Sequence, residues 1–402
     1  MRAAVVISTD PSRPGLGAAQ FVAGKPLIVR AIDAVRSCRW ADVICVVSTE
    51  PEVLDLAHRA GAATVAGIAG HAEDVRSDHP AAVPLIQHAL GSIRPVGDAM
   101  PEHVLWVSPS FPLVEPEDWE GAIDSVRETD IGWTFSAVEP GGAVWSQPTV
   151  DGAAAPVAAA RGSQTSGRLL IDAAAFYAFR TDAISRDGPL FNAALPRVLA
   201  RERALEVRTQ ADVQAAEYIL RARERDRAVR QIPRPLGAIV FDFDGVFTDN
   251  RVVVFQDGRE AAVCDRADGW GLGQLKKKLT APILVLSTER NPIVRARCEK
   301  LRLECINDVP DKLPVLREWL ANKQIDPAAV VYVGNDVNDL SCMSEVGCPV
   351  AVADAYPQVK AVARIVLSAA GGKGAVRELT ELVVAALDLP GPDRTGVSME
   401  AT

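Results

Sequence analysis

The stretch GAIVFDFDGVFT, residues 237–248, places two carboxylates directly after a run of apolar residues. A short continuous apolar run of this kind is typical of a strand buried in a parallel sheet. In open α/β sheets, ligands bind beyond the carboxyl ends of the strands. We therefore expect Asp242 and Asp244 to lie at the ligand-binding edge of such a sheet.

Three further segments bring polar side chains to the same edge. Ser287 follows the apolar run Ile283–Leu286, and Lys312 begins a predicted helix after the loop 307–311. The apolar run Val330–Val333 leads to a cluster of amide and acidic side chains, namely Asn335, Asp336 and Asp339.

These residue types indicate phosphate chemistry. Two acidic clusters repel each other unless a cation lies between them, and a few hard oxygen ligands favour Mg²⁺. Lysine and a serine hydroxyl suit the remaining phosphate oxygens. A carboxylate such as Asp242 can attack phosphorus to give an aspartyl-phosphate, while Asp244 has the reach to protonate the leaving oxygen and then activate water.

The four pieces together resemble the motifs of the haloacid dehalogenase superfamily of phosphotransferases. The resemblance implies that Asp242 is the nucleophile, Asp244 the general acid and base, and Ser287 and Lys312 the groups that grip the phosphate. It also implies a magnesium site made by Asp242, the Asp244 carbonyl and residues of the cluster at 335–339. Asn335 stands where the superfamily often has Asp, so weaker metal binding is expected unless Asp336 or Asp339 compensates. Alternatively, Asp339 complements a helix dipole or acts behind the metal ligands.

Within that superfamily, residues 237–385 resemble 3-deoxy-octulosonate 8-phosphate phosphatases. The matching segments are DFDGVFTD, the short hairpin after it, Arg266-Ala-Asp-Gly269, Asp311-Lys-Leu313 and Gly371-Gly-Lys-Gly-Ala-Val-Arg-Glu378. Ser287–Val294 resembles the form found when these phosphatases are fused behind sialic-acid cytidylyltransferases. The resemblance implies no large cap domain, a hairpin that covers a neighbouring subunit's site, and a tetramer, with a dimer as the alternative. It places Arg266, Lys373 and Arg377 at the substrate or at a subunit contact.

Bulk properties fit a two-domain α/β enzyme. The chain has 402 residues, 48% apolar and 24% charged, and more than one core is the default at this length. A net charge of −9 argues against nucleic-acid or membrane partners. The seven cysteines lack a paired CxxC pattern and are expected to be free thiols in a reducing compartment. With neither a signal peptide nor a membrane span evident, we expect a cytoplasmic protein.

Apolar runs alternate with helical stretches in both halves, which predicts two doubly wound parallel sheets: a Rossmann-like, nucleotidyltransferase-like domain followed by a cap-less haloacid dehalogenase-like domain. The expected strands of the first half are Ala3–Ile7, Val43–Val47, Val104–Val107 and Ile131–Ser136, with a loop at Asp151–Gly167. A charged helix from Gln210 to about Arg230 ends at two prolines, Pro233 and Pro235. We therefore predict domains at 1–230 and 236–388, followed by a disordered tail at 389–402.

The first half, residues 1–225, resembles CMP-sialic acid synthetases in Ala23-Gly-Lys-Pro-Leu-Ile28, Val46–Pro51 and Pro109–Leu113. In four places its functional positions differ from that family. The stretch Ser8–Gln20 has one basic residue, Arg13, where a CTP triphosphate needs several. The segment Ser108–Val114 lacks the Gln and the Arg that the family has at the corresponding positions. Asp172-Ala-Ala174 replaces an Asn-Gly-Ala segment, and the paired metal aspartates fall at Glu206 and Arg208. We expect a degenerate synthetase, whose residual ligand candidates are Lys25, Arg76, Gln164 and Arg168.

The sequence thus predicts a magnesium-dependent phosphatase for a nonulosonate 9-phosphate or an octulosonate 8-phosphate. Two alternatives concern the first half: a working cytidylyltransferase that uses CTP and releases a CMP-sugar, or a non-catalytic scaffold or sensor.

Overall fold

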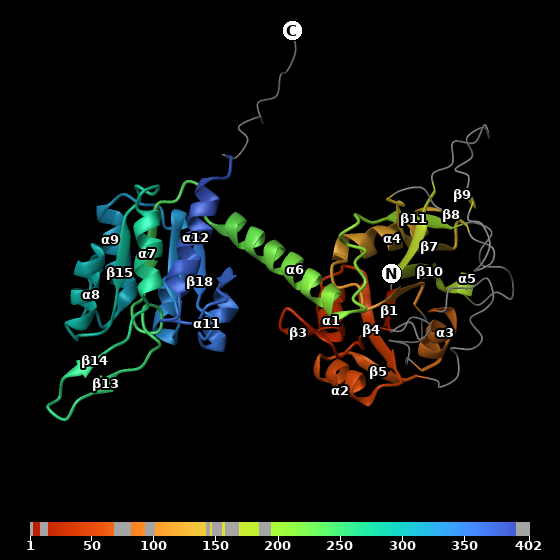
Figure 1. Cartoon of the computed structure of the whole chain (residues 1–402), viewed down its shortest axis with the longest axis horizontal. Coiled ribbons are helices and arrows are strands. Elements are labelled where there is room, and N and C mark those ends of the chain that lie inside the picture. Colours follow the sequence, from red (N-terminus) through yellow and green to blue (C-terminus); the bar gives the residue numbers. More distant parts are fainter. Residues whose placement is uncertain are drawn as a thin grey trace, which may run out of the picture. The chain divides into compact units, whose positions relative to one another are not determined.

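The computed structural model describes residues 3–8, 15–67, 82–92, 101–141, 145–146, 155–156, 169–184 and 194–390. The chain divides into two compact units between Arg221 and Ala222, inside helix α6 (Gln210–Gln231) (Figure 1). Val213 and Leu220 of α6 belong to the core of the first unit, whereas Val229 belongs to that of the second. The sequence pattern places the boundary just after this helix, while the compact units divide within it. Arg13, Arg76, Gln164, Arg168 and the segment 391–402 lie outside the described residues.

The first unit contains a seven-stranded sheet in the order β11-β7-β10-β6-β1-β4-β5. Strand β10 runs antiparallel to both of its neighbours, so the sheet is mixed and the expectation of a fully parallel sheet is wrong here. The strands are β1 (Ala3–Ile7), β4 (Ala41–Ser48), β5 (Ala63–Ala66), β6 (His103–Val107), β7 (Trp133–Val138), β10 (Ile171–Arg180) and β11 (Leu195–Val198).

Helices cover both faces of this sheet. One core cluster joins it to α1 (Leu27–Arg36), α2 (Pro51–Arg59) and α4 (Pro116–Glu128). Another joins it to α3 (Ala82–Ser92) and α5 (Thr181–Ile184). Two short antiparallel pairs complete the described part of the unit: β2 (Phe21–Val22) with β3 (Lys25–Pro26), and β8 (Trp145–Ser146) with β9 (Ala155–Pro156). Strand β9 lies in the stretch 151–167 that was predicted to be a loop, and most of that stretch lies outside the described residues.

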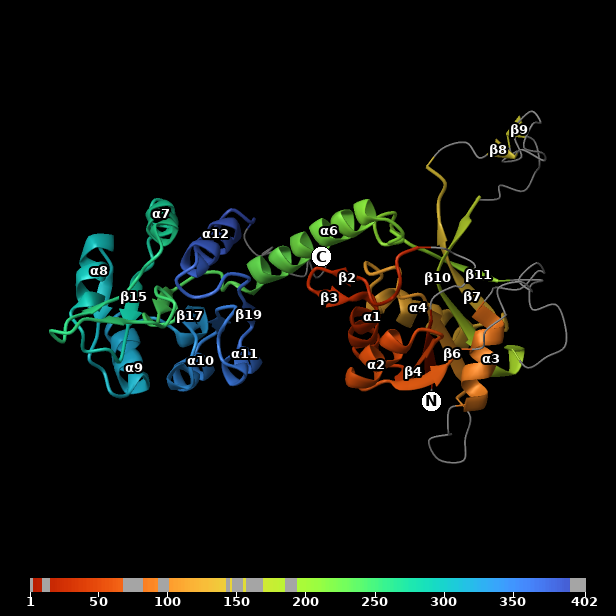
Figure 2. The same cartoon turned by 60° about the horizontal axis from the view of Figure 1, so that its bottom comes forward.

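The second unit contains a six-stranded parallel sheet in the order β16-β15-β12-β17-β18-β19. Its strands are β12 (Ala238–Phe241), β15 (Ile283–Leu286), β16 (Glu304–Ile306), β17 (Val330–Gly334), β18 (Cys348–Ala351) and β19 (Ile365–Val366). Figure 2 shows α7 (Arg266–Leu275), α8 (Ile293–Leu301) and α12 (Ala375–Leu387) on one face, and α9 (Lys312–Asn322), α10 (Leu340–Glu345) and α11 (Pro357–Val362) on the other. The parallel sheet with helices on both faces confirms the expected α/β architecture of this half.

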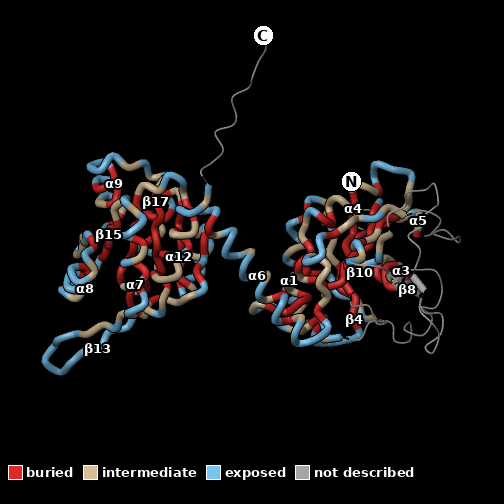
Figure 3. Tube along the Cα trace, turned by 45° about the horizontal axis from the view of Figure 1, so that its top comes forward, coloured by how far each residue is buried: buried red, intermediate tan, exposed pale blue. Residues whose placement is uncertain are grey.

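The strands of this sheet are buried because they are apolar along their whole length and both faces are covered. All four residues of β12 and all five of β17 are buried, and Figure 3 shows the buried residues concentrated in the strands. A predicted hairpin projects from the unit as β13 (Val253–Val254) and β14 (Glu260–Ala261). Gly258 in its Asp-Gly turn has φ +82°, a conformation that favours glycine. Its apolar side chains are exposed, namely Val252, Val253, Val254, Phe255 and Val263.

Several boundaries match the sequence prediction: β1 spans Ala3–Ile7, β15 spans Ile283–Leu286, and α9 begins at Lys312. Helix α9 begins where expected because the Asp311 side chain accepts a hydrogen bond from Leu313 N at 3.2 Å. The sequence pattern also predicts a helix at Asp339–Glu345. In the structure this helix, α10, starts at Leu340, after the 3₁₀ turn η2 (Val337–Asp339). The seven cysteines are all free, as predicted. Among the described residues, no helix is both long enough and apolar enough to span a bilayer.

Candidate active site

The site lies at the carboxyl ends of three neighbouring strands. Strand β12 is flanked by β15 and β17, and Phe241 is in register with Val285 on one side and Val333 on the other. The next residues of the chain therefore leave the sheet side by side, with Asp242 after β12, Ser287 after β15 and Asn335 after β17. The structure thus brings together strand ends that the sequence pattern predicted to meet.

Lys312 joins two of the predicted carboxylates. Its Nζ lies 2.7 Å from Asp242 Oδ1 and 2.8 Å from Asp339 Oδ1, and the lysine side chain has 0% exposure. Burial alone lowers the pKa of Lys312, but the two carboxylates raise it by more, so the lysine stays protonated. Burial, followed by the Asp339 charge, raises the pKa of Asp242.

Asp339 is saturated by protein donors. Besides Lys312, Oδ1 accepts from the Tyr332 hydroxyl at 2.8 Å, and Oδ2 accepts from Asn335 N at 3.0 Å and from Asp336 N at 3.4 Å. The carboxylate has 0% exposure. This environment favours Asp339 as the group that holds Lys312 in place. Tyr332 was not anticipated, although a tyrosine in the otherwise aliphatic strand Val330–Gly334 is the signal that marks it.

Asn335 has the opposite character. Its Oδ1 is buried and has no hydrogen-bond partner among the described residues. A buried amide oxygen is seldom left unpaired, so this atom is available to a ligand outside the protein. The amide packs against the turn after Asp244, where a Cβ on Gly245 would collide with it, and Gly245 itself has φ +77°.

The surroundings of Asn335 fit a magnesium ion. Asn335 Oδ1, the Asp242 carboxylate and the Asp244 carbonyl are hard oxygen donors at adjoining strand ends, and Mg²⁺ is often held by only one or two carboxylates. Among the described residues, no three His, Cys, Asp or Glu side chains form a metal-binding group. An ion here would therefore depend on the amide and carbonyl oxygens. Asp336, another of the predicted ligands, accepts from Val337 N at 2.6 Å.

Asp244 follows Asp242 by two residues, and Ser287 lies at the end of the neighbouring strand β15. Ser287 is 1% exposed, and its hydroxyl accepts from Glu289 N at 3.0 Å. Asp244 is only partly buried. Burial, followed by the negative charge of Glu289, raises the pKa of Asp244 above its usual value. Glu289 is thus an acidic neighbour of the site that the motif-based reading did not include.

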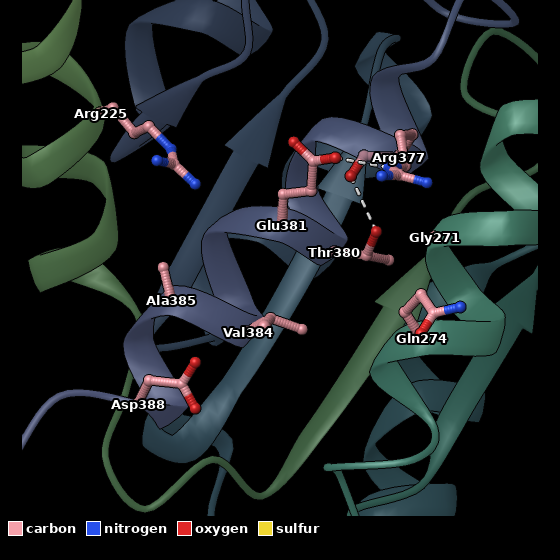
Figure 4. Close-up of a pocket in the computed structure, with 9 residues that line it drawn as sticks. All are labelled: Arg225, Gly271, Gln274, Arg377, Thr380, Glu381, Val384, Ala385 and Asp388. Carbon is pink, nitrogen blue, oxygen red and sulfur yellow. Dashed lines mark hydrogen bonds and ion pairs between the residues drawn. The ribbon is translucent and has the colours of Figure 1, made fainter.

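The three predicted substrate residues have different surroundings. Arg266 is exposed at the start of α7, and Lys373 is exposed just before α12. Arg377 is engaged elsewhere, because its Nε donates to Glu381 Oε1 at 2.6 Å. Its side chain lines a pocket of about 330 Å³ between the end of α6, α7 and α12 (Figure 4). Among the described residues, the guanidinium of Arg377 has no hydrogen bond to the turn 242–248.

The corresponding positions of the first unit are occupied by local contacts. Arg208 Nε lies 3.4 Å from Glu206 Oε2, and a Cβ on Gly17 would lie 3.2 Å from Glu50 Oε2. Asp172 accepts from Ala174 N at 2.8 Å through Oδ1 and from the Tyr177 hydroxyl at 2.8 Å through Oδ2. Lys25 forms an exposed ion pair with Asp33 at 3.0 Å. At these positions the two cations, Arg208 and Lys25, are thus each paired with a carboxylate.

A buried lysine between two aspartates, with a serine and an amide at neighbouring strand ends of a parallel sheet, is the arrangement of a haloacid dehalogenase-like hydrolase. The family model with that description matches residues 289–379.

Curated relatives show which family of haloacid dehalogenase-like hydrolases the chain belongs to. The chain is 33% identical over 153 residues to the 3-deoxy-D-manno-octulosonate 8-phosphate phosphatase of Yersinia pestis, a match that covers 37% of this chain and 80% of the relative. The phosphatase of Escherichia coli K12 is 33% identical over 151 residues, with 37% and 79% covered. The chain therefore belongs to this phosphatase family of haloacid dehalogenase-like hydrolases, which confirms the resemblance predicted for the second half. The chain is an enzyme of the phosphatase class.

Solved structures give similar matches. A haloacid dehalogenase family hydrolase from Streptomyces avermitilis is 44% identical, with 39% of this chain and 89% of that chain covered and a TM-score of 0.37. The 3-deoxy-D-manno-octulosonate 8-phosphate phosphatase of Moraxella catarrhalis, whose structure holds magnesium, phosphate and the sugar acid, is 26% identical, with 41% and 91% covered and a TM-score of 0.37.

Proposed function

We propose that the second unit is a magnesium-dependent phosphomonoesterase for a phosphorylated sugar acid, either an octulosonate 8-phosphate or a nonulosonate 9-phosphate. The observation that carries the proposal is the environment of Asp242. Oδ1 accepts from Phe243 N at 2.7 Å and pairs with Lys312 at 2.7 Å. Oδ2 has no contact of this kind among the described residues, so it is the atom left to attack phosphorus.

The placement of the side chains supports the following reaction. Asp242 Oδ2 forms a bond to phosphorus while the bond from phosphorus to the sugar oxygen breaks, and Asp244 gives its proton to that oxygen. Asp244 then takes a proton from water, whose oxygen attacks the phosphorus of the aspartyl-phosphate. Inorganic phosphate leaves and Asp242 is regenerated.

The remaining groups of the site stabilise charge. Lys312 holds Asp242 in place, and its ammonium group together with the Ser287 hydroxyl suits the phosphate oxygens. A magnesium ion held by Asp242, the Asp244 carbonyl and Asn335 would neutralise negative charge shared by the nucleophile and the phosphate. Family membership supports the sugar-acid substrate, because the curated relatives are named for an octulosonate 8-phosphate.

The test is phosphate release from octulosonate 8-phosphate, nonulosonate 9-phosphate and p-nitrophenyl phosphate in the presence of Mg²⁺. Replacing Asp242 by Asn should abolish release from all of them. Asp326→Asn is a matched control, because Asp326 is an exposed acid that caps the 3₁₀ turn η1 (Pro327–Ala329), ahead of β17 and at the opposite edge of the sheet. Unchanged release in Asp242→Asn would refute the nucleophile, and failure of the wild type with both sugar acids would refute the substrate class.

We infer that the first unit is not a working cytidylyltransferase. The close approach of Glu50 to Gly17 and the pairing of Arg208 with Glu206 support this inference, because a triphosphate normally needs several free cations. A scaffold role remains for the unit. CTP-dependent pyrophosphate release would contradict the inference.

We also infer that the enzyme is a homo-oligomer, a dimer or tetramer. The hairpin β13–β14 exposes five apolar side chains, with Val254 63% and Val263 68% exposed. An exposed apolar patch of this kind usually marks a contact surface. Val254→Glu should lower the mass measured by light scattering, whereas an unchanged mass would place the contact elsewhere.

A further inference from the structure

The segment 368–374, which connects β19 to α12, packs on the turn that carries Asp242 and Asp244. Gly372 N donates to Val246 O at 3.0 Å. A Cβ on Gly371 would collide with the Gly245 carbonyl, and Gly372 has φ +66°. Two glycines therefore allow one backbone to lie directly against the other.

Two carboxylates from other parts of the fold hold this segment by its backbone amides. Asp354, in the turn after β18, accepts from Gly371 N at 2.9 Å through Oδ1. Glu378, in the first turn of α12, accepts from Ser368 N at 2.9 Å and from Ala369 N at 2.7 Å. Neither carboxylate forms an ion pair in the described part of the chain, so their bonds go to the segment.

Helix α12, which follows the segment, is itself fixed to α7. Gly374, the N-cap residue of α12, has φ +90° and offers no side chain as a cap. Asp268 of α7 supplies an acceptor instead, taking a hydrogen bond from Arg377 N at 2.9 Å. The two helices approach closely where a Cβ on Gly271 would collide with the Thr380 hydroxyl, and Figure 4 shows Gly271, Thr380 and Arg377 together.

Lys373 lies near the end of the segment 368–374, two residues before helix α12. Its backbone N donates to Ala370 O at 3.1 Å, while its side chain is exposed and has no hydrogen bond or ion pair among the described residues. The residue next to it, Gly372, contacts the turn that carries Asp242 and Asp244. The ammonium group of Lys373 is therefore a free cation next to a backbone that packs on the turn carrying the predicted nucleophile.

We propose that Asp354 and Glu378 are positioning residues for the phosphatase reaction, which hold the segment 368–374 so that Lys373 meets the anionic sugar-acid part of the substrate at the mouth of the site. This inference rests on the proposed function. A flexible lysine loses rotamer and backbone freedom when it binds, and a segment that is already ordered reduces that cost.

The test compares a large with a small substrate in the full-length enzyme. In Asp354→Ala and in Glu378→Ala, kcat/KM for the sugar-acid phosphate should fall about tenfold, mostly through KM, which is the range for a lost hydrogen bond to a charged group. For p-nitrophenyl phosphate, which has no sugar acid, kcat/KM should change less than about twofold by the same reasoning. Asp354→Asn keeps an acceptor oxygen and should restore most of the loss.

A double-mutant cycle tests whether Asp354 acts through Lys373. If Asp354 acts through Lys373, then Lys373→Ala combined with Asp354→Ala should be no worse on the sugar-acid phosphate than Lys373→Ala alone. The matched control is Asp326→Ala. Asp326 Oδ1 also accepts from a backbone amide, Ala328 N, at 2.9 Å, but in an exposed turn outside the segment 368–374. This control should leave both substrates unaffected.

Hydrogen exchange tests whether Asp354 and Glu378 hold the segment 368–374, independently of any effect on catalysis. Amides 368–371 should exchange faster in Asp354→Ala and Glu378→Ala than in the wild type, whatever the substrate. Unchanged exchange, an equal loss on both substrates, or additive effects in the double mutant would overturn the positioning role. A wild type that hydrolyses neither substrate would refute the proposed function instead, and the exchange result would still decide the tether.

Discussion

In the first unit, buried hydroxyls of the sheet are used for structural bonds. Ser8 Oγ accepts from Trp106 Nε1 at 2.8 Å, and Ser136 Oγ accepts from Ala175 N at 2.9 Å. In the second unit, polar groups at the strand ends include charged and unpaired ones: Lys312 joins two buried carboxylates, and Asn335 Oδ1 has no partner among the described residues. Both units share an α/β architecture, so the fold alone does not explain the difference.

The charges of the two units show the same contrast. Arg203 in the first unit pairs with Asp118 at 3.0 Å and with Glu115 at 2.7 Å, and Arg208 pairs with Glu206, so opposite charges meet in local pairs. In the second unit, burial and Asp339 raise the pKa of Asp242. Buried groups whose charged form is disfavoured are characteristic of functional sites. The comparison teaches that buried charged side chains gathered at adjoining strand ends, rather than topology, distinguish the unit that carries chemistry.

The largest expected effect comes from removing the lysine of the second unit. Lys312→Met should reduce phosphate release by a factor of about 10² or more and lower the free energy of unfolding by about 3–5 kcal/mol, since it leaves two buried carboxylates without their cation. The measurements are phosphate release with saturating Mg²⁺ and denaturant unfolding.

Two control variants sharpen this result. Lys323→Ala removes an exposed ion pair with Glu304, at 3.0 Å, and should cost less than about 1 kcal/mol. Arg203→Met breaks the cluster of the first unit and should leave phosphate release intact. Full stability in Lys312→Met, or loss of phosphatase activity in Arg203→Met, would break the comparison between the units.

The next effect concerns the unpaired amide. Asn335→Ala removes the free Oδ1, and we expect the Mg²⁺ concentration for half-maximal activity to rise about tenfold, as for other losses around metal sites. Asn335→Asp adds a negative charge and should lower that concentration. The measurement is a Mg²⁺ titration with p-nitrophenyl phosphate. Identical titrations for the wild type and Asn335→Ala would place the ion away from this residue.

Much of the second unit could be predicted because its signals are local. The apolar runs Ala238–Phe241 and Ile283–Leu286 form strands with those boundaries, and Asp311 caps α9 as its position before Lys312 indicates. The members of the site could be predicted for the same reason. Each follows a strand or begins a helix, and the ends of parallel strands meet at one edge.

Contacts between distant residues could not be predicted. The Tyr332–Asp339 bond depends on how the turn after β17 folds back, and the bond from Arg377 N to Asp268 joins residues 109 positions apart. Strand direction could not be predicted either. The sequence of β10, IDAAAFYAFR, has the composition of a strand but does not indicate that the strand pairs antiparallel. Pattern gives the elements and their ends, whereas long-range packing decides which polar atoms are satisfied.

A smaller effect is expected from pH, through Asp268 of the second unit. Burial raises its pKa to about 6, and Oδ2 has no partner among the described residues. The unfolded carboxyl titrates near pH 4, so between about pH 4 and 6 the folded state retains a proton that the unfolded state releases. The free energy of unfolding should therefore fall as pH rises through this window. Asp268→Asn should flatten this slope in urea unfolding of the full chain, and parallel curves for the two proteins would contradict the assignment.

The last prediction is that CTP has no effect on the first unit. The experiment adds CTP to the Asp242→Asn variant, which is expected to be inactive as a phosphatase. Glu50 lies against Gly17 and Arg208 is paired with Glu206, so the described part of the first unit offers a triphosphate a carboxylate where it needs cations. A ligand at about 100 times its Kd stabilises a folded protein by about 2.7 kcal/mol, which a melting experiment detects readily. Millimolar CTP with Mg²⁺ should leave the melting curve unchanged and release no pyrophosphate when a sialic acid is added. A clear upward shift or pyrophosphate release would show that residues beyond these pairs, Arg13 among them, complete a nucleotide site, and the contrast between a silent and a catalytic unit would then fail.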